Sequence, residues 1–234
     1  MGKVRAVCIS EKRGTQKKNI ESAVFVENWG IEGDAHAGNW HRQISLLSEE
    51  TIAAFKARGA EVTDGAFGEN LVVSGYDFTK FPVGTRFTCK DVVLELTQIG
   101  KECHHGCEIF QKMGECIMPT NGVFAKVLHG GKISVGDEFH VQYRAAVITL
   151  SDTASKGERE DASGAAAEEI VGKEGYEVVF KKIIPDDGDT LTALLCELSD
   201  EDKADLILTT GGTGFSQRDN TPEATMRAVE RETP

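Results

Sequence analysis

The pattern of apolar and polar positions changes near residue 143 and divides the chain into two parts. Before that point, short alternating or β-branched runs are separated by glycines and polar turns, which is typical of strands. These runs are VRAVCIS, ESAVFVEN, NLVVSG, TRFTCKDVVLELTQI and ISVGDEFHVQY. One segment, LLSEETIAAFKARG, predicts a helix, with Ser48 as its N-cap, Glu49 and Glu50 in its first turn and Gly59 after its last turn. We therefore expect residues 1–142 to form a compact, barrel-like β domain with one convincing helix.

Strands and helices alternate in residues 143–234. Three apolar runs are typical of buried strands: AAVITLS, YEVVFKKII and DLILTT. The segments between these runs, SGAAAEEIVGKEG and TLTALLCELSDED, have apolar residues at helical spacing. Such alternation predicts a mainly parallel sheet, with ligands outside the carboxyl ends of its strands. The whole chain is therefore expected to be an α+β protein of two domains, and its second domain is expected to be α/β.

Composition and charge narrow the possible partners. In the 234 residues, the net charge of −12 disfavours nucleic acid, and no apolar run approaches the ~20 residues that would cross a membrane. The N-terminal segment has no secretion-signal pattern, so we expect a cytoplasmic protein whose six cysteines are reduced. Acidic residues are concentrated in the second domain. An anionic ligand there would have to be held by backbone N–H groups and a bridging cation.

The loops after the three predicted strands of the second domain carry its candidate chemistry. In the third loop, Gly211, Gly212 and Gly214 allow a tight turn with outward N–H groups, and Thr213 adds a hydroxyl donor, which suits an anion. A tight turn that merely closes a strand would look the same. Thr221 is expected to cap the following helix, with Pro222 in its first position.

Two carboxylates follow strand ends in loops that should converge. Asp186 and Asp219 near a phosphate-binding turn suggest a Mg²⁺ site, although solvated loop charges would give the same pattern.

The motifs ITLSDTAS, IIPDDGD and TTGGTGFSQRDNTPEAT, in this order and spacing, resemble the molybdopterin adenylyltransferase (MoaB/Mog-type) family. The resemblance covers residues 144–234 and implies transfer of AMP from Mg-ATP to the terminal phosphate of molybdopterin. It implies that Asp186 and Asp219 are catalytic and hold Mg²⁺. It further implies ligand contacts at Ser151, Asp152, Thr210, Gly211, Gly212, Thr213 and Gly214.

Domains of that family continue well beyond the segment TPEATMRAVERE, with further strands that complete the sheet. We therefore expect the second domain to be truncated at its C-terminus, and its sheet to be incomplete. The relatives also suggest a homo-oligomer, a trimer.

The first domain contains a cysteine cluster, GKECHHGCEIFQKMGEC. The spacing of Cys103, Cys107 and Cys116 fits structural zinc poorly, whereas imidazolium groups of His104 and His105 could lower a thiol pKa. Either Cys103 or Cys107 is then a candidate nucleophile or persulfide carrier. Buried, inert thiols are the alternative, which fits best for Cys8, Cys89 and Cys196.

A second polar segment of the first domain, GDAHAGNWHRQ, places His36, His41 and Arg42 before the predicted helix, and Asn70 enters a strand further on. Histidines beside an arginine could receive an anionic ligand, and a polar surface loop would look the same.

These segments together resemble the MOSC family, named for the C-terminal domain of molybdenum cofactor sulfurase. The resemblance runs through GDAHAG, HRQISLLS, GAFGENL, PVGTRF, the cysteine before HHGC, and VFAKVLHGGKISVGD. It implies a β-barrel-like fold that binds molybdenum cofactor, with His36, His41, Arg42 and Asn70 as ligand contacts. Sulfur would be carried on Cys103, with Cys107 and Cys116 as alternatives.

Full sulfurases also have a pyridoxal-phosphate desulfurase domain, which nothing here resembles. A cysteine desulfurase or other sulfur donor and a recipient molybdoenzyme are therefore the expected partners. The favoured interpretation is molybdenum cofactor maturation. The alternatives are a non-catalytic molybdopterin carrier or chaperone and a thiol-based metal or redox sensor.

Overall fold

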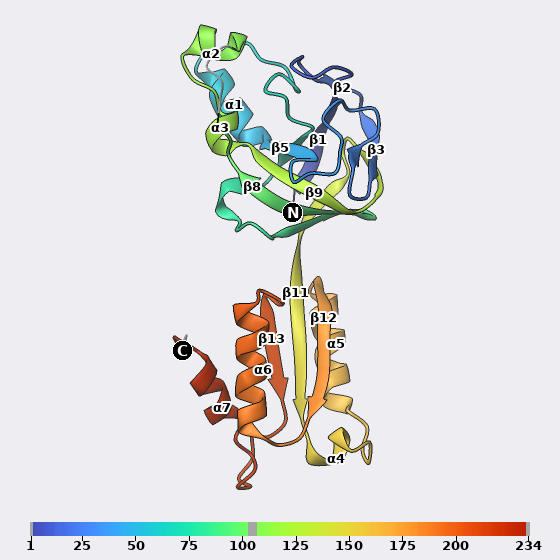
Figure 1. The fold of residues 1–234 in the computed structure, drawn as a ribbon, viewed down its shortest axis with the longest axis vertical. Coiled ribbons are helices and arrows are strands. Elements are labelled where there is room, and N and C mark those ends of the chain that lie inside the picture. The colour runs from blue at the N-terminus through green and yellow to red at the C-terminus, as the bar shows by residue number, and fades with distance from the viewer. Residues whose placement is uncertain (1, 103–106, 233–234) are drawn as a thin grey trace. The chain divides into compact units, whose positions relative to one another are not determined.

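The computed structural model describes residues 2–102 and 107–232 and divides into two compact units, Met1–Val141 and Gln142–Pro234 (Figure 1). Among these residues, no helix is both long enough and apolar enough to cross a membrane. Each unit has its own hydrophobic core.

The first unit is built on a large mixed sheet. Its strands are β1 (Gly2–Ile9), β2 (Lys18–Asn19), β5 (Ile44–Ser48), β6 (Leu71–Ser74), β7 (Arg86–Cys89), β8 (Val92–Ile99), β9 (Val123–His129) and the start of β11 (Glu138–Leu150). Their order is β11-β7-β8-β9-β5-β6-β1-β2, and β11 also pairs with β1 through Phe139 and Gly2. A separate small sheet has the order β10 (Gly131–Ser134), β3 (Ser22–Val26), β4 (Gly30–Ile31).

The predicted helix of the first unit is confirmed as α1 (Glu49–Ala57). The Ser48 hydroxyl accepts the N–H of Thr51 at 3.1 Å, and Gly59 follows the helix with φ +95°. The expectation of a single helix was wrong. Within residues 2–102 and 107–141, three further short helices are present: η1 (Phe78–Lys80), α2 (Glu108–Met113) and α3 (Met118–Asn121). They are too short to show a helical period in the sequence.

Two apolar clusters fill the first unit. One is rich in aromatic rings, with Phe87 stacked on Phe139 at 5.4 Å between ring centroids. The other packs Ile52 and Phe55 of α1 together with Ile109 of α2 and Met118 of α3. The second cluster explains why α2 and α3 form despite their length, because their buried apolar side chains dock them on the sheet.

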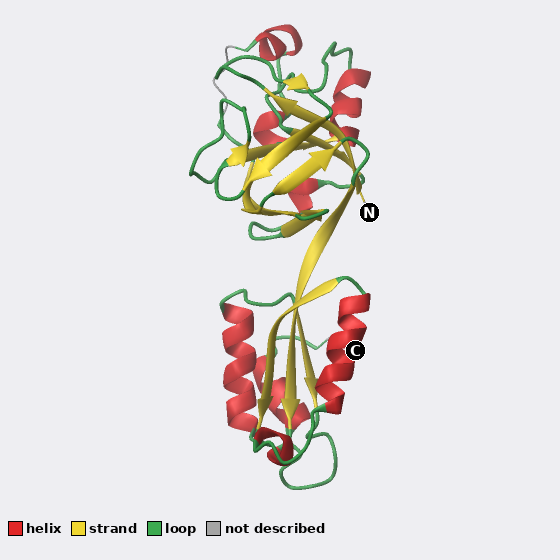
Figure 2. Ribbon diagram, turned by 90° about the vertical axis from the view of Figure 1, so that its right-hand side faces the viewer, coloured by secondary structure: helices red, strands yellow, loops and turns green. Residues whose placement is uncertain are grey.

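The second unit contains three parallel strands. The C-terminal part of β11 is central, with β12 (Tyr176–Ile184) on one side and β13 (Leu206–Thr210) on the other, which confirms the predicted parallel pairing. Its helices are α4 (Asp152–Ser155), α5 (Ala162–Lys173), α6 (Gly188–Asp200) and α7 (Thr221–Ala228). Helices lie on both faces of this sheet (Figure 2).

The core of the second unit follows from the alternation along β11. Ala146, Ile148 and Leu150 pack with Leu191 and Leu198 of α6, and all five are buried. Because the three strands run in the same direction, their carboxyl ends bring the loops after Leu150, Ile184 and Thr210 to one edge of the sheet.

Candidate functional sites

Two of these loops are tied together by a pair of aspartates. The backbone N–H of Asp152 donates to Asp186 Oδ2 at 3.0 Å, and the N–H of Asp186 donates to Asp152 Oδ1 at 3.2 Å. Each carboxylate therefore fixes the backbone of the other loop. The loops after β11 and β12 therefore converge, as expected from the parallel topology, and two reciprocal hydrogen bonds join them.

The third loop begins with a turn that only glycine can form. Gly211 and Gly212 have φ of +87° and +59°, and a Cβ on Gly211 would lie 2.1 Å from the Leu150 oxygen. A Cβ on Gly212 would lie 2.4 Å from Thr221 Oγ1. The turn is therefore pressed against the end of β11, which leaves no room for any side chain.

The prediction that Thr221 caps α7 was wrong. Asn220 occupies the N-cap position without a side-chain hydrogen bond, and Thr221 is already inside the helix. The Thr221 hydroxyl donates instead to the Gly211 oxygen at 2.9 Å, and its N–H donates to the Gly212 oxygen at 3.1 Å. Thr221 therefore holds the glycine turn instead of capping the helix.

Asp186 and Asp219 both lie against the glycine turn. Asp186 Oδ1 would be 3.5 Å from a Cβ on Gly212, and Asp219 Oδ2 would be 2.9 Å from a Cβ on Gly214. Asp219 Oδ2 also accepts the N–H of Ser216 at 2.9 Å. The two predicted carboxylates are therefore on the same turn as the glycines, with Asp186 reaching it from a different loop.

Arg218 was missed at the sequence level, although it directly precedes Asp219. Its Nη2 donates to Asp152 Oδ1 at 2.7 Å, and its Nε lies 2.7 Å from Asp152 Oδ2. Burial would raise the pKa of Asp152, but hydrogen bonds from Arg218 and from the Asp186 N–H outweigh it and lower that pKa. The sequence signal that could have found Arg218 is its positive charge beside Asp219 in a loop whose other charged residues are acidic.

The remaining predicted contacts of this edge have varied surroundings. The Ser151 hydroxyl caps α4 by accepting the N–H of Ala154 at 3.1 Å, so it is already in use. Thr210 ends β13 opposite Thr149 of β11, and Thr213 is exposed.

A magnesium ion fits this set of donors only with help from a substrate. In the described ranges, no group of three or more His, Cys, Asp and Glu side chains is arranged to hold a metal. Mg²⁺ in phosphate-handling sites usually takes one or two carboxylates and completes its shell with phosphate oxygens and water. Asp186 and Asp219 supply two carboxylates beside the glycine turn, which meets that requirement.

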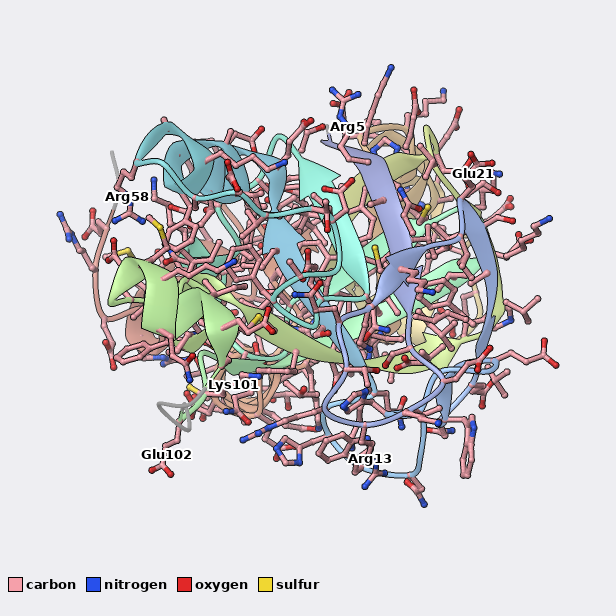
Figure 3. All side chains as sticks on the ribbon, turned by 90° about the horizontal axis from the view of Figure 1, so that it is seen from above. Arg5, Arg13, Glu21, Arg58, Lys101 and Glu102 are labelled. Carbon is pink, nitrogen blue, oxygen red and sulfur yellow. The ribbon has the colours of Figure 1, made fainter. Side chains whose placement is uncertain are left out.

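The first unit contains a cavity of about 800 Å³. It is lined by three of the predicted ligand residues, His36, Arg42 and Asn70. The sequence did not single out Lys17 and Lys101, which also line it. Lys101 and Arg13 lie on the same side of this unit (Figure 3). The cavity is therefore bordered by cationic groups, which suits an anionic ligand.

One of the residues that line this cavity, Lys17, belongs to a buried ion pair. Lys17 Nζ lies 2.8 Å from Asp34 Oδ2, and the two side chains are 2% and 0% exposed. Asp34 also accepts the N–H of Ser10 at 3.0 Å. Asn70 joins this network by donating to Asp34 Oδ2 at 3.2 Å and to the Cys8 oxygen at 3.0 Å. Asn70 therefore braces the wall rather than offering its amide N–H groups to a ligand.

The two predicted histidines differ in position. His36 lines the cavity, and its pKa is lowered, first by burial and then by the charge of Lys17, against the opposing effect of Asp34. His41 is not among the lining residues. Its Nε2 lies 3.1 Å from Gln98 Oε1, which also accepts from Arg42 Nε at 2.9 Å.

The candidate sulfur carrier, Cys103, lies outside the described residues, as do His104 and His105. Cys107 is exposed and lines the cavity, and Cys116 is half-buried. The expectation of buried thiols is confirmed for Cys8 and Cys89, which are 0% and 1% exposed, and burial raises the pKa of each to about 12. Cys196 is only half-buried, so that expectation was wrong for it.

A buried carboxyl, Glu69, lies beside Asn70 and was also missed. Its Oε1 accepts the N–H of Gly65 at 2.7 Å and its Oε2 the N–H of Phe67 at 3.0 Å. Burial raises the pKa of Glu69 to about 7, against these hydrogen bonds.

Comparisons with known families match each unit separately. Residues 33–140 match the MOSC domain family, and residues 146–234 match a family described as a probable molybdopterin binding domain. The chain therefore contains a MOSC domain followed by a domain of the probable molybdopterin binding family. These matches support a role in molybdenum cofactor biosynthesis.

Several curated relatives of the second domain are molybdopterin adenylyltransferases. That of Pyrococcus furiosus is 42% identical over 90 residues, which is 38% of this chain and 52% of the relative. That of Helicobacter pylori is 39% identical over 90 residues, 38% of this chain and 51% of the relative. The chain thus spans about half the length of these relatives.

Among solved structures, the YUAD protein of Bacillus subtilis is 22% identical. The match covers 60% of this chain and 96% of the YUAD chain, with a TM-score of 0.52. This likeness shows a shared fold.

Proposed function

We propose that the second domain transfers an adenylyl group from Mg-ATP to molybdopterin. The observation that carries this proposal is that Asp186 lies beside Gly212 and Asp219 beside Gly214, at the carboxyl edge of three parallel strands. The names of the curated relatives agree with this activity.

The proposed reaction asks the chain to bind and align rather than to form covalent bonds. A phosphate oxygen of molybdopterin attacks the α-phosphorus of ATP, the bond to the bridging oxygen breaks, and pyrophosphate leaves. Backbone N–H groups of Gly212 and Gly214 would bind phosphate oxygens. Asp186 and Asp219 would hold Mg²⁺, whose charge offsets that of the phosphates when it is bound.

The first domain, in this proposal, is barrel-like and binds molybdenum cofactor in its cavity. The strand pairings support a barrel. β11 pairs with β7 at one end of the order β7-β8-β9-β5-β6-β1 and with β1 at the other end, so these strands make a ring. Arg42 and Lys101 would face the anionic groups of the cofactor. Sulfur from a cysteine desulfurase would be carried on Cys103 to a recipient molybdoenzyme.

The second candidate function is a non-catalytic molybdopterin carrier. It is favoured by the description of the matched family, which specifies binding of molybdopterin and not transfer. A carrier would need the glycine turn and not the paired carboxylates.

Release of pyrophosphate from Mg-ATP in the presence of molybdopterin tests the adenylyltransferase. The parent protein should release it, and Asp219→Ala should abolish the release. The control Glu197→Ala removes an exposed carboxylate of α6, paired with Lys203, and should behave as the parent. Molybdopterin binding without pyrophosphate release by the parent would support the carrier instead.

Mass mapping of the protein after incubation with a cysteine desulfurase and cysteine tests the sulfur proposal. A persulfide is expected on Cys103. A persulfide found only on Cys107 or Cys116 would transfer the assignment to that residue.

A further inference from the structure

Arg218 stands out because it is a cation surrounded by carboxylates at the proposed phosphate site. Its guanidinium contacts both oxygens of Asp152 at 2.7 Å, and its charge also helps to lower the pKa of Asp187. Arginine in a two-pronged pair of this kind has the same geometry that it uses to bind phosphate. The guanidinium therefore already has a carboxylate in the place that a phosphate group would take.

The loop that carries Arg218 has few other attachments. Ser216 bonds with Asp219 inside the loop through its N–H and its oxygen, at 2.9 and 3.0 Å, and the Arg218 N–H donates to Ser216 Oγ at 3.3 Å. Of the hydrogen bonds that residues 213–218 make within the described chain, those of Arg218 to Asp152 are the ones that reach another loop.

The ion pair is also open to water. The side chain of Arg218 is 58% exposed and that of Asp152 35% exposed. Exposed pairs of this kind contribute little to stability, so separating the two groups costs little. Asp152 would keep its hydrogen bond with the Asp186 N–H after separation, so the loop after β11 would stay in place.

We propose that Arg218 binds a phosphate group of the substrate, and that its ion pair with Asp152 keeps the guanidinium beside the site until that phosphate arrives. When a phosphate group enters the glycine turn, the guanidinium exchanges the Asp152 carboxylate for phosphate oxygens. Without that exchange, the triphosphate would meet the negative charges of Asp152, Asp186 and Asp219 with its charge offset only by Mg²⁺. This inference rests on the proposed function, because it assigns the phosphate to a substrate of that site.

A double-mutant cycle in the full chain tests the exchange. Asp152→Asn keeps an oxygen that can accept from the Asp186 N–H, but it removes the charge and one of the two acceptor oxygens that hold Arg218. Binding of Mg-ATP and of molybdopterin is measured separately by calorimetry. Asp152→Asn should tighten binding of at least one of them about three- to fivefold, since an exposed pair no longer has to break. Arg218→Gln should weaken the same ligand roughly tenfold or more.

The two effects should not add, because Asp152 acts through Arg218. In the Arg218→Gln background, Asp152→Asn should therefore tighten binding clearly less than in the parent background, because only the repulsion by the Asp152 charge is then relieved. The exposed pair of Lys173 and Glu169 on α5 provides a matched control, because Lys173→Gln and Glu169→Gln make the same charge changes elsewhere in the unit. Neither control variant, alone or combined, should alter binding.

The ligand whose affinity changes in these variants, Mg-ATP or molybdopterin, is the one whose phosphate Arg218 binds. The exchange is overturned if Asp152→Asn weakens binding, or if it has the same effect with and without Arg218. If the parent binds neither Mg-ATP nor molybdopterin, the proposed function fails as well, so the two failures are distinguishable.

Discussion

Asp152 and Asp186 hold each other's backbone through reciprocal hydrogen bonds of 3.0 and 3.2 Å. One carboxylate oxygen of Asp186 is used in this way, and the other lies near Gly212. This arrangement separates two roles within one side chain. Oδ2 positions the loop, and Oδ1 is directed to the proposed phosphate site.

The two roles of Asp186 predict a specific mutational result. Asp186→Asn can keep the hydrogen bond to the Asp152 N–H while it loses the charge for Mg²⁺. Pyrophosphate release should fall by roughly 100-fold or more, as expected for loss of one group that stabilises the transition state. The midpoint of thermal unfolding should change little. An Asp186→Asn protein of normal activity would remove this residue from the proposed site.

The neighbouring aspartate, Asp187, has a structural role that can be tested on its own. It is the N-cap of α6 and accepts the N–H of Thr190 at 3.1 Å. Asp187→Ala should lower the free energy of unfolding of the second unit by about 1 kcal/mol, and Asp187→Ser should restore most of it. Urea unfolding followed by circular dichroism measures both. Equal stability of the alanine and serine variants would contradict the capping role.

The buried pair of the first unit predicts a large effect from a single charge. Lys17→Met leaves the Asp34 carboxylate buried without its cation, which should cost about 3–5 kcal/mol. The neighbouring Lys18 is exposed, so Lys18→Met is the matched control and should cost little. Both tryptophans, Trp29 and Trp40, belong to the first unit, so tryptophan fluorescence in urea reports on it alone. Similar losses in the two variants would contradict the account.

Glu69 should make the first unit less stable as the pH rises. Its folded-state pKa is raised from 4.5 to about 7, so the native state binds the proton more tightly than the unfolded state. Its contribution is complete below pH 4.5 and is lost as the pH rises through 7. His36, whose pKa is lowered from 6.5, has the opposite effect, since its contribution is lost as the pH falls.

Comparison with Glu69→Gln isolates the carboxyl, because His36 titrates in both proteins. The unfolding free energy of the parent minus that of Glu69→Gln, measured by tryptophan fluorescence, should decrease as the pH rises from 4.5 to 7, because only the parent loses stability when Glu69 deprotonates. A difference independent of pH would show that Glu69 does not titrate in this range.

Much of the fold follows from local pattern. The alternation in the second half predicts its parallel strands, because buried strands and crossover helices of this length allow few other arrangements. The helices α2 and α3 could not be predicted in this way. They form because Ile109 and Met118 dock on a cluster whose other members are distant in sequence.

The site was predictable where chemistry is local and not where it is shared between loops. The glycine turn and the carboxylates of Asp186 and Asp219 are visible as motifs. The pairing of Arg218 with Asp152 joins residues 66 positions apart, and no spacing rule reveals it. The same holds for Lys17, whose burial depends on Asp34 and Asn70 in other segments.

The central claim is that the second domain adenylates molybdopterin at the glycine turn. The most direct measurement supplies the full chain with molybdopterin, Mg²⁺ and ATP labelled at the α-phosphorus, and then separates pterin from nucleotide. The account predicts label on the pterin for the parent, far less for Asp186→Asn and none for Asp219→Ala. Molybdopterin that binds to the parent but stays unlabelled would contradict it.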